Sequence, residues 1–297
     1  MKTHIAVVGP GAIGGTLAAW LDQVPGHEVT VCARTPFERL VVDVPGGRTL
    51  ESTPEVLTDP ARAREVDWVV TVTKTYDTEG AASWLARLVG PGTRVVVVQN
   101  GVEHMERFPG LVPSERTLPA IIDIPAARSA PGRIQQGRHG DFTVPEGDLG
   151  RAFAALFAGL PLAPRTTADF LSASWRKLAL NSAAVVNCLA RRPAILARSA
   201  KAAAVMRAVT AEAVAVGRAM GAQLPDGLPD EVIARYLDAP PGQTSSVLAD
   251  WLAGRPLEID ARNGVIVRMG EKLGVPTPLN AMAVAVMEAA MEVGAAP

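Results

Sequence analysis

Short runs of β-branched residues alternate with helical stretches in the first half of the chain. Residues 4–9, 28–34, 68–73 and 94–101 are rich in Val and Ile with few polar interruptions. Such runs are typical of strands buried on both faces of a parallel sheet. Between the first two runs, residues 12–26 have the pattern of a helix that ends at Pro and Gly. This alternation predicts a doubly wound α/β sheet.

The hydrophobic pattern changes in the second half. Residues 132–147 have the pattern of two strands, which we expect to be antiparallel and to close the sheet. Residues 160–169 are rich in Pro and polar residues, and long Ala-rich helical stretches follow them, including 201–222 and 280–293. We therefore place a domain boundary near residue 166, between a doubly wound α/β domain and an all-helical C-terminal domain.

Composition narrows the class of protein. Hydrophobic residues make up 48% of the chain and charged residues 20%, which favours a substantial core over disorder. A net charge of −1 and the lack of a long basic run argue against nucleic acid or an anionic membrane as partner. The two cysteines, Cys32 and Cys188, lie far apart in apolar settings. With no uninterrupted apolar stretch of membrane-spanning length, these features predict a cytoplasmic protein without disulfides or a membrane span.

A glycine-rich loop directly follows the first predicted strand. Gly9, Gly11 and Gly14 form the pattern G-x-G-x-x-G, with Ala12 and Ile13 between the last two glycines. The first glycine permits a tight turn, the second lets a pyrophosphate approach the backbone, and the third lets helix and strand pack closely. Because the loop opens a helix, the pyrophosphate would also meet the positive end of the helix dipole. These five residues are therefore predicted to bind a dinucleotide.

The end of the second predicted strand bears on the choice between NAD and NADP. An acidic residue there would hold the ribose hydroxyls of NAD, but this chain has Arg34, and no acid occurs before Glu38. A guanidinium can bind the extra phosphate of NADP with two hydrogen bonds, whereas an acid would repel it. The alternative is that Arg34 is a solvated residue at the end of a strand. We expect NADP(H).

Residues 174–184, SWRKLALNSAA, place Lys177 and Asn181 four residues apart within an apolar segment. On a helix the two side chains would share one face. By itself this pattern fits a lysine whose stem covers apolar neighbours while its ammonium reaches water. This is the interpretation that the segment alone favours, and the alternative is a polar pair that faces a binding cleft.

Taken together, the chain resembles the ketopantoate reductases (2-dehydropantoate 2-reductases). The resemblance rests on five segments in the order and spacing of that family, across nearly the whole chain. The segments are GPGAIGG, TVTKTYDT with Lys74, VVVVQNG with Asn100, SWRKLALN with Lys177 and Asn181, and SSVLADWLAGRPLEIDARNG with Ser246 and Glu258.

The resemblance implies an NADP-binding Rossmann domain over residues 1–166 and a helical substrate and catalytic domain over 167–297. NADPH and a 2-oxo acid would meet in the cleft between the domains. Lys177 would be the general acid and Glu258 would complete the catalytic site. Asn100, Asn181 and Ser246 would bind substrate, with Lys74 and Asn100 beside the cofactor. The implied reaction is the reduction of ketopantoate to pantoate.

The chemistry of carbonyl reduction agrees with these roles. Hydride addition to a ketone develops negative charge on the carbonyl oxygen, so a positioned proton donor such as Lys177 is needed. An amide such as that of Asn181 can bind a hydroxyl or carbonyl without adding charge. The histidines lack the spacing of a metal site, so we expect no metal. A reductase of another small carbonyl compound and a non-catalytic dinucleotide sensor are the alternatives.

Several of these residues have an ordinary structural interpretation as well. Glu258 could simply complement a helix dipole, and Asp260 would do so equally well. Ser246 could begin a helix, as Ser245 could. Lys74 could be a solvated loop residue. Asn100 could mark a turn, which is compatible with aiming its amide at a ligand.

One position departs from the family pattern. A second asparagine is expected one helical turn after Asn181, but Val185 stands there. Asn187 lies about 200° further round an ideal helix, so it could substitute only if the helix bulged. We therefore expect a more apolar pocket, which would suit a substrate with fewer hydroxyls. The Ala-rich helices beyond residue 200 could line the interface of a homodimer or pack within their domain.

Overall fold

The computed structural model describes residues 2–294, which divide into two compact units. The first unit runs to Gln99 and continues over Glu103–Phe170. The second contains Asn100–Val102 and everything from Leu171 onward. The short segment Asn100–Val102 thus belongs by its contacts to the helical unit, although it directly follows the sheet in sequence.

The first unit is built on a parallel sheet with the strand order β5-β2-β1-β6-β7-β8. Every pairing in this sheet is parallel, with β1 between β2 and β6. The order reverses direction at β1, as in doubly wound folds that bind dinucleotides. The strands are β1 (Thr3–Val8), β2 (His27–Cys32), β5 (Glu55–Leu57), β6 (Trp68–Thr71), β7 (Arg94–Val97) and β8 (Thr117–Pro119).

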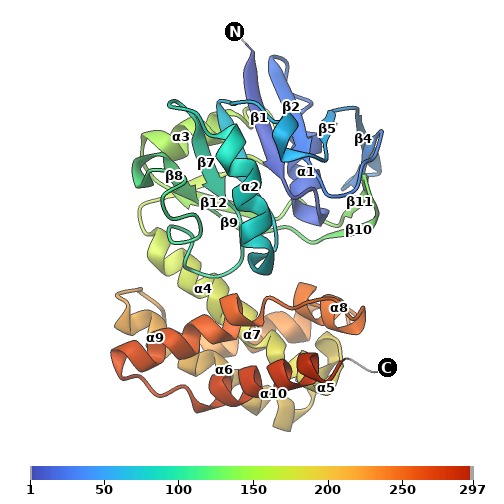
Figure 1. The fold of residues 1–297 in the computed structure, drawn as a ribbon. Coiled ribbons are helices and arrows are strands. Elements are labelled where there is room, and N and C mark those ends of the chain that lie inside the picture. Colours follow the sequence, from blue (N-terminus) through green and yellow to red (C-terminus); the bar gives the residue numbers. More distant parts are fainter. Residues whose placement is uncertain (1, 295–297) are drawn as a thin grey trace. The chain divides into compact units, whose positions relative to one another are not determined.

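Alternate side chains of these strands enter separate cores on the two faces of the sheet. On one face, Val7 of β1 packs with Leu17 of α1 (Ala12–Leu21) and Phe153 of α3 (Asp148–Ala155). On the other face, Val8 packs with Leu85 of α2 (Thr78–Leu88), the helix that crosses the sheet in Figure 1. Because successive strand residues point to opposite faces, an unbroken apolar run serves both cores. The predicted doubly wound sheet is confirmed.

Two further sheets complete the first unit. The second sheet has the order β10-β11-β3-β4 and the third β13-β12-β9. Their strands are β3 (Leu40–Val44), β4 (Arg48–Ser52), β10 (Ala126–Ala130), β11 (Arg133–Gln136), β9 (Ile121–Asp123), β12 (Asp141–Pro145) and β13 (Arg165–Thr167). The 3₁₀ turns are η1 (Pro60–Arg62), η2 (Thr75–Asp77) and η3 (Ser114–Arg116).

The expectation that residues 132–147 form an antiparallel pair closing the main sheet was wrong. They do form two strands, β11 and β12, but the strands lie in different sheets. A strand has two edges, and β10 and β3 already occupy both edges of β11. Strand β12 therefore pairs with β9 and β13.

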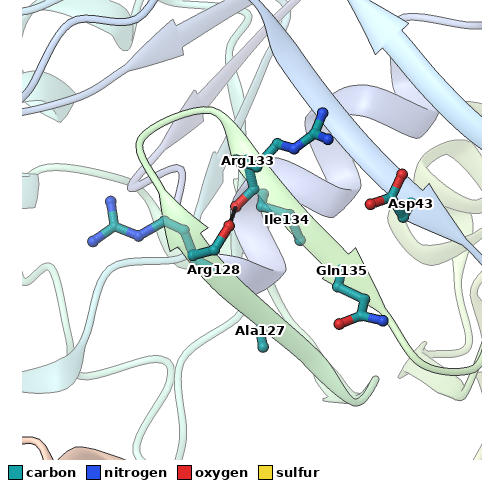
Figure 2. Close-up of a pocket in the computed structure, with 7 residues that line it drawn as sticks. Asp43, Ala127, Arg128, Arg133, Ile134 and Gln135 are labelled. Atoms are coloured by element: carbon teal, nitrogen blue, oxygen red, sulfur yellow. Dashed lines mark hydrogen bonds between the residues drawn. The ribbon is translucent and has the colours of Figure 1, made fainter.

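A hollow of about 200 Å³ lies beside this second sheet. Figure 2 shows residues of β3, β10 and β11 that line it. The pairing of β10 with β11 shifts register between Arg128 and Ala130, and the hydroxyl of Ser129 donates to the carbonyl oxygen of Arg133. Such a bulge leaves one residue unmatched and bends the strand. None of the residues predicted to form the functional site lines this hollow.

The second unit is helical over its described residues, as Figure 1 shows. Its core packs Trp175 and Leu178 against Met206, Leu248 and Ile266. The helices are α4 (Phe170–Ser182), α5 (Ala184–Ala190), the 3₁₀ helix η4 (Ala194–Arg198), α6 (Ala200–Ala219), α7 (Leu228–Asp238), α8 (Ser246–Leu252), the π-helical segment η5 (Asp260–Gly264), α9 (Val265–Leu273) and α10 (Pro278–Glu292).

The long Ala-rich helices α6 and α10 follow the predicted helical stretches closely. Buried residues of both helices, including Met206 and Met287, belong to the core of the unit. Within residues 2–294, we find no helix with both the length and the apolar character needed to cross a bilayer.

Candidate functional site

The glycine-rich loop adopts the geometry that its spacing predicts. Gly9 has a φ of +90°, a conformation that residues with a Cβ rarely adopt. A Cβ on Gly14 would lie 2.2 Å from the carbonyl oxygen of Gly9, so only glycine lets the helix start this close to the strand. Around Gly11 the space is open, with no heavy atom within 4 Å of an ideal Cβ. An incoming group can therefore reach the backbone at Gly11.

Helix α1 begins at Ala12, next to this open space. Its first turn contains no acidic side chain, so nothing on the helix itself offsets the positive end of the dipole. Strand β1 ends at the point where the strand order of the sheet reverses. A phosphate-sized anion at such a helix start is favoured by the free N–H groups and by the dipole. The loop with Ala12 and Ile13 therefore fits the pyrophosphate of a dinucleotide.

Arg34 follows β2 at the same edge of the sheet. Its side chain is 84% exposed, and its guanidinium lies 3.8 Å from the carboxylate of Asp77. An exposed ion pair at this distance contributes little, so the guanidinium can turn toward another anion at small cost. The neighbouring strand-end residues Cys32 and Ala33 are buried and bring no acid to this position.

The ends of β6 and β7 are tied together by side chains. The amide nitrogen of Gln99 donates to the hydroxyl of Thr73 over 3.0 Å, and His104 contacts the carbonyl oxygen of Gln99. Lys74 comes next in the chain, half-buried, directly before η2. Parallel strands present their carboxyl ends at one edge, where ligands of open α/β sheets bind. Lys74 therefore follows β6 at the edge of the sheet where its prediction as a cofactor-binding residue requires it to be.

In the helical unit, α4 separates an apolar face from a polar one. Trp175, Leu178 and Ala179 are at most 1% exposed and pack in the core. Lys177 and Asn181 are half-buried on the other side of the helix. The apolar side chains of residues 174–184 thus face the core, as their hydrophobic character suggests. Lys177 and Asn181 lie outside that core.

Glu258 and Asp260 are two residues apart but have different surroundings. Glu258 is 5% exposed, and the side-chain amide of Asn100 donates to its Oε2 over 2.9 Å. Asp260 is exposed and pairs with Arg268. Burying a carboxylate costs free energy, so the burial of Glu258 needs a physical reason. An exposed ion pair such as that of Asp260 has no such cost. The structure thereby separates two acids that the sequence left equivalent.

Ser245 and Ser246 are distinguished in the same way. Ser245 caps α8, because its hydroxyl accepts a hydrogen bond from the backbone N–H of Leu248 over 3.3 Å. Ser246 is the first residue of the helix, and its hydroxyl accepts from a guanidinium nitrogen of Arg262 over 3.4 Å. The helix-start role therefore belongs to Ser245, and the hydroxyl of Ser246 serves another contact.

Arg262 is a residue that the sequence interpretation missed. It lies in η5, is 3% exposed, and donates to the carbonyl oxygen of Asn181 over 2.8 Å. Burial lowers the pKa of Arg262, and the carboxylate of Glu258 acts in the opposite direction. A signal was present in the sequence, since Arg262 is a charged residue four positions after Glu258 and shortly before the apolar run of residues 265–267.

Val185 and Asn187 both have structural roles. Val185 is 1% exposed and belongs to the core of the helical unit, so the expectation that it forms an apolar pocket wall was wrong. Asn187 is 2% exposed, and its amide nitrogen donates to the carbonyl oxygens of Arg192 and Pro193. Its hydrogen bonds hold the turn after α5, so it does not substitute for a second substrate-binding asparagine.

This chain is similar to known proteins over nearly its whole length. A 2-dehydropantoate 2-reductase of Caulobacter vibrioides is 56% identical over 97% of this chain and 99% of that protein. One from Mycobacterium tuberculosis is 36% identical over 98% and 99% of the two chains. A crystal structure of a PanE/ApbA family ketopantoate reductase from Ralstonia eutropha JMP134 superimposes with a TM-score of 0.88 at 29% identity, covering 98% and 99% of the chains.

Family models agree with these likenesses in both parts of the chain. The model described as Ketopantoate reductase PanE/ApbA matches residues 5–148. The model described as Ketopantoate reductase PanE/ApbA C terminal matches residues 169–291. The glycine-rich loop falls within the first match, and Lys177, Asn181, Ser246, Glu258 and Arg262 fall within the second. This chain therefore belongs to the ketopantoate reductase family.

Proposed function

We propose that the protein reduces a 2-oxo acid to a 2-hydroxy acid with NADPH, and that its substrate is ketopantoate (2-dehydropantoate), which becomes pantoate. One observation in the structure carries the proposal. Glu258 is a buried carboxylate held by Asn100, in the same unit as the half-buried Lys177. A dinucleotide sensor needs the glycine-rich loop but has no use for this polar set. The near full-length likeness to the Caulobacter vibrioides reductase points to the same substrate.

NADPH would be held by the first unit. Gly9, Gly11 and Gly14, with the backbone at Ala12 and Ile13, suit the pyrophosphate, because the loop is open at Gly11 and the helix dipole is unopposed in its first turn. Arg34 would bind the 2′-phosphate, since it is exposed after the end of β2 and its ion pair with Asp77, at 3.8 Å, is weak enough to be exchanged. Lys74 and Asn100 would lie beside the cofactor. Bound NADPH supplies the hydride to the carbonyl carbon.

Side chains of the protein donate the proton and orient the substrate. The ammonium of Lys177 donates its proton to the carbonyl oxygen as negative charge develops there. Glu258 completes the catalytic set with its carboxylate, which Asn100 fixes in place. Asn181 and Ser246, with Asn100, bind the oxygens of the substrate through an amide or a hydroxyl, so they add no net charge.

The departure at Val185 no longer argues against ketopantoate. The expectation of a substrate with fewer hydroxyls assumed that Val185 forms the pocket wall, but this side chain is buried in the core. We therefore retain ketopantoate as the proposed substrate.

We assign cofactor binding to residues 1–166 and substrate binding to 167–297, together with Asn100. We place the enzyme in the cytoplasm. The homodimer remains a prediction, which a measurement of the molar mass by light scattering would test.

The first test is the oxidation of NADPH, followed by its absorbance, with ketopantoate and with a panel of other 2-oxo acids. We expect turnover in the ordinary enzyme range of about 1–1000 per second with ketopantoate, and a higher kcat/KM with NADPH than with NADH. Turnover of a different 2-oxo acid in place of ketopantoate would replace the proposed substrate. NADPH binding without any reduction would overturn the enzymatic function.

The role of Lys177 is tested by the variant Lys177→Ala. Removing the proton donor should lower kcat by about 100- to 10,000-fold while the dissociation constant for NADPH changes little. Lys201→Ala is the matched control, because Lys201 is an exposed lysine on α6. Unchanged turnover in Lys177→Ala would contradict the mechanism.

A further inference from the structure

Arg262 is a cation in the interior of the helical unit, and neither the family resemblance nor the proposed mechanism gives it a role. It is 3% exposed. It lies in the π-helical segment η5, which begins two residues after Glu258. Arginine is almost never fully buried unless its charge is paired, and π-helical segments occur frequently at functional sites. The position of Arg262 therefore requires an explanation.

The guanidinium of Arg262 connects two segments that are distant in sequence. Its Nη2 donates to the backbone carbonyl of Asn181 over 2.8 Å, and its Nη1 lies 3.4 Å from the hydroxyl oxygen of Ser246. Asn181 is near the end of α4, and Ser246 is the first residue of α8. Arg262 thus contacts two of the residues that we propose to bind substrate.

The neighbouring residue strengthens the attachment to α4. Asn263 donates to the carbonyl oxygen of Ser182 over 3.1 Å, directly after the carbonyl that Arg262 binds. The last carbonyls of a helix lack partners within the helix and form the negative end of its dipole. Two consecutive residues of η5 therefore bind two consecutive carbonyls at the end of α4, and the charged one lies where a cation is favoured.

Arg262 also balances the charge of the buried acid. Among the charged groups that act on Arg262, Glu258 has the largest effect. Glu258 is itself 5% exposed and has the neutral Asn100 as a hydrogen-bond donor. A buried carboxylate is costly unless an opposite charge accompanies its hydrogen bonds. Glu258 and Arg262, four residues apart, bring both charges to the same region.

We propose that Arg262 is the positioning residue of the substrate site, holding Asn181, Ser246 and Glu258 in one arrangement through its two hydrogen bonds and its charge. The inference rests on the proposed role of those three residues in reduction. Arg262 acts through them and does not touch the reacting atoms. Since the three residues come from different segments, losing Arg262 would change their mutual geometry, and misplacement of about 1 Å can cost a factor of about 100 in rate.

The test compares Arg262→Met and Arg262→Lys with the wild-type enzyme. In Arg262→Met we expect kcat to fall about 10- to 100-fold and KM for the 2-oxo acid to rise, with the NADPH dissociation constant unchanged. Arg262→Lys keeps the charge and one donor, so it should recover part of kcat. Arg268→Met is the matched control, because Arg268 is an exposed arginine of α9 that pairs with Asp260.

A second measurement separates positioning from mere loss of stability. Added guanidinium at millimolar concentration should restore part of the activity of Arg262→Ala, because it can occupy the vacated space and rebuild the hydrogen bonds. It should not restore Lys177→Ala. Thermal unfolding of each variant measures the folded fraction at the assay temperature. If Arg262→Met and Arg262→Ala do not fold, Arg262→Lys is compared with the wild type in their place.

The outcomes distinguish this inference from the proposed function. If the wild type reduces no 2-oxo acid, the proposed function fails and the inference fails with it. If the wild type is active and folded Arg262→Met keeps kcat and KM within about twofold, only the inference fails. It also fails if neither lysine nor guanidinium recovers any activity beyond what the folded fraction explains.

Discussion

Glu258 and Asp260 show how burial assigns different roles to two like residues. Both are acids near the start of the same helical segment, yet one is buried against Asn100 and the other is exposed against Arg268. The resemblance selected Glu258, and the environment of the side chain now supplies a physical reason for that choice. Burying a charge costs free energy, which hydrogen bonds or an opposite charge must offset.

This difference predicts opposite outcomes for two conservative variants. Glu258→Gln keeps the volume and an oxygen for Asn100 but removes the charge, so kcat should fall by about 100-fold. Asp260→Asn removes an exposed charge and should leave kcat within about twofold. Steady-state kinetics with the 2-oxo acid measures kcat for both variants. Equal losses in both variants would remove Glu258 from the catalytic set.

Among the elements, the glycine-rich loop separates cofactor binding from folding. Gly14 is in contact with the carbonyl of Gly9, whereas Gly11 has open space beside it. The same substitution at the two positions should therefore affect different properties of the protein.

We expect Gly14→Ala to destabilise the protein by about 1–3 kcal/mol, because the added methyl group has no room. Gly11→Ala should leave the thermal midpoint almost unchanged and weaken NADPH binding, because the methyl group occupies the approach of the pyrophosphate. Thermal melts and titrations of NADPH fluorescence measure the two effects. Unweakened NADPH binding in Gly11→Ala would contradict the assignment of this loop.

Element boundaries also show where the sequence was insufficient. The predicted parallel strands and the helix after the loop lie within a few residues of β1, β2, β6, β7 and α1. The strand predicted for residues 94–101 ends at Val97, and Asn100 lies beyond it in the short segment that belongs to the helical unit. The short strand β5 was missed, because three residues carry too little periodicity to distinguish a strand from a loop.

At the scale of the whole molecule, buried acidic groups limit stability at high pH. Burial raises the pKa of Cys32 to about 12 and that of Cys188 to about 11, from 9.0 for a free thiol, and raises that of Tyr236 to about 12. The folded state therefore retains protons that the unfolded state loses. The stabilising contribution is complete below about pH 9 and is lost as the pH rises toward 11–12.

We accordingly expect the free energy of unfolding to fall above about pH 9, by up to about 1.4 kcal/mol per pH unit for each group, and the thermal midpoint to fall with it. The variant Cys188→Ala should show a shallower decline, because it removes one of these groups. Both thiols should also fail to react with a thiol reagent at pH 8 until the protein is denatured. A midpoint that is constant up to pH 11 would contradict the buried, protonated state of these side chains.

Local sequence patterns were enough to predict the doubly wound sheet, the helical character of the second half and the glycine-rich loop. These features follow from short-range patterns, because strand and helix periodicity and the spacing of glycines are local properties. The family resemblance added Lys177, Asn181, Ser246 and Glu258 as candidates. Their roles remain predictions, of which Lys177→Ala and Glu258→Gln test two.

The polar residues that are buried together could be identified from the packing of the folded chain but not from the sequence. Arg262 contacts a carbonyl 81 positions earlier in the chain, and Asn100 reaches Glu258 across 158 positions. Val185 became a core residue and Asn187 the support of a turn through the packing around α5. No local pattern encodes such contacts, because burial and partner choice depend on how distant segments pack, and the cost of burying a charge is set by those partners.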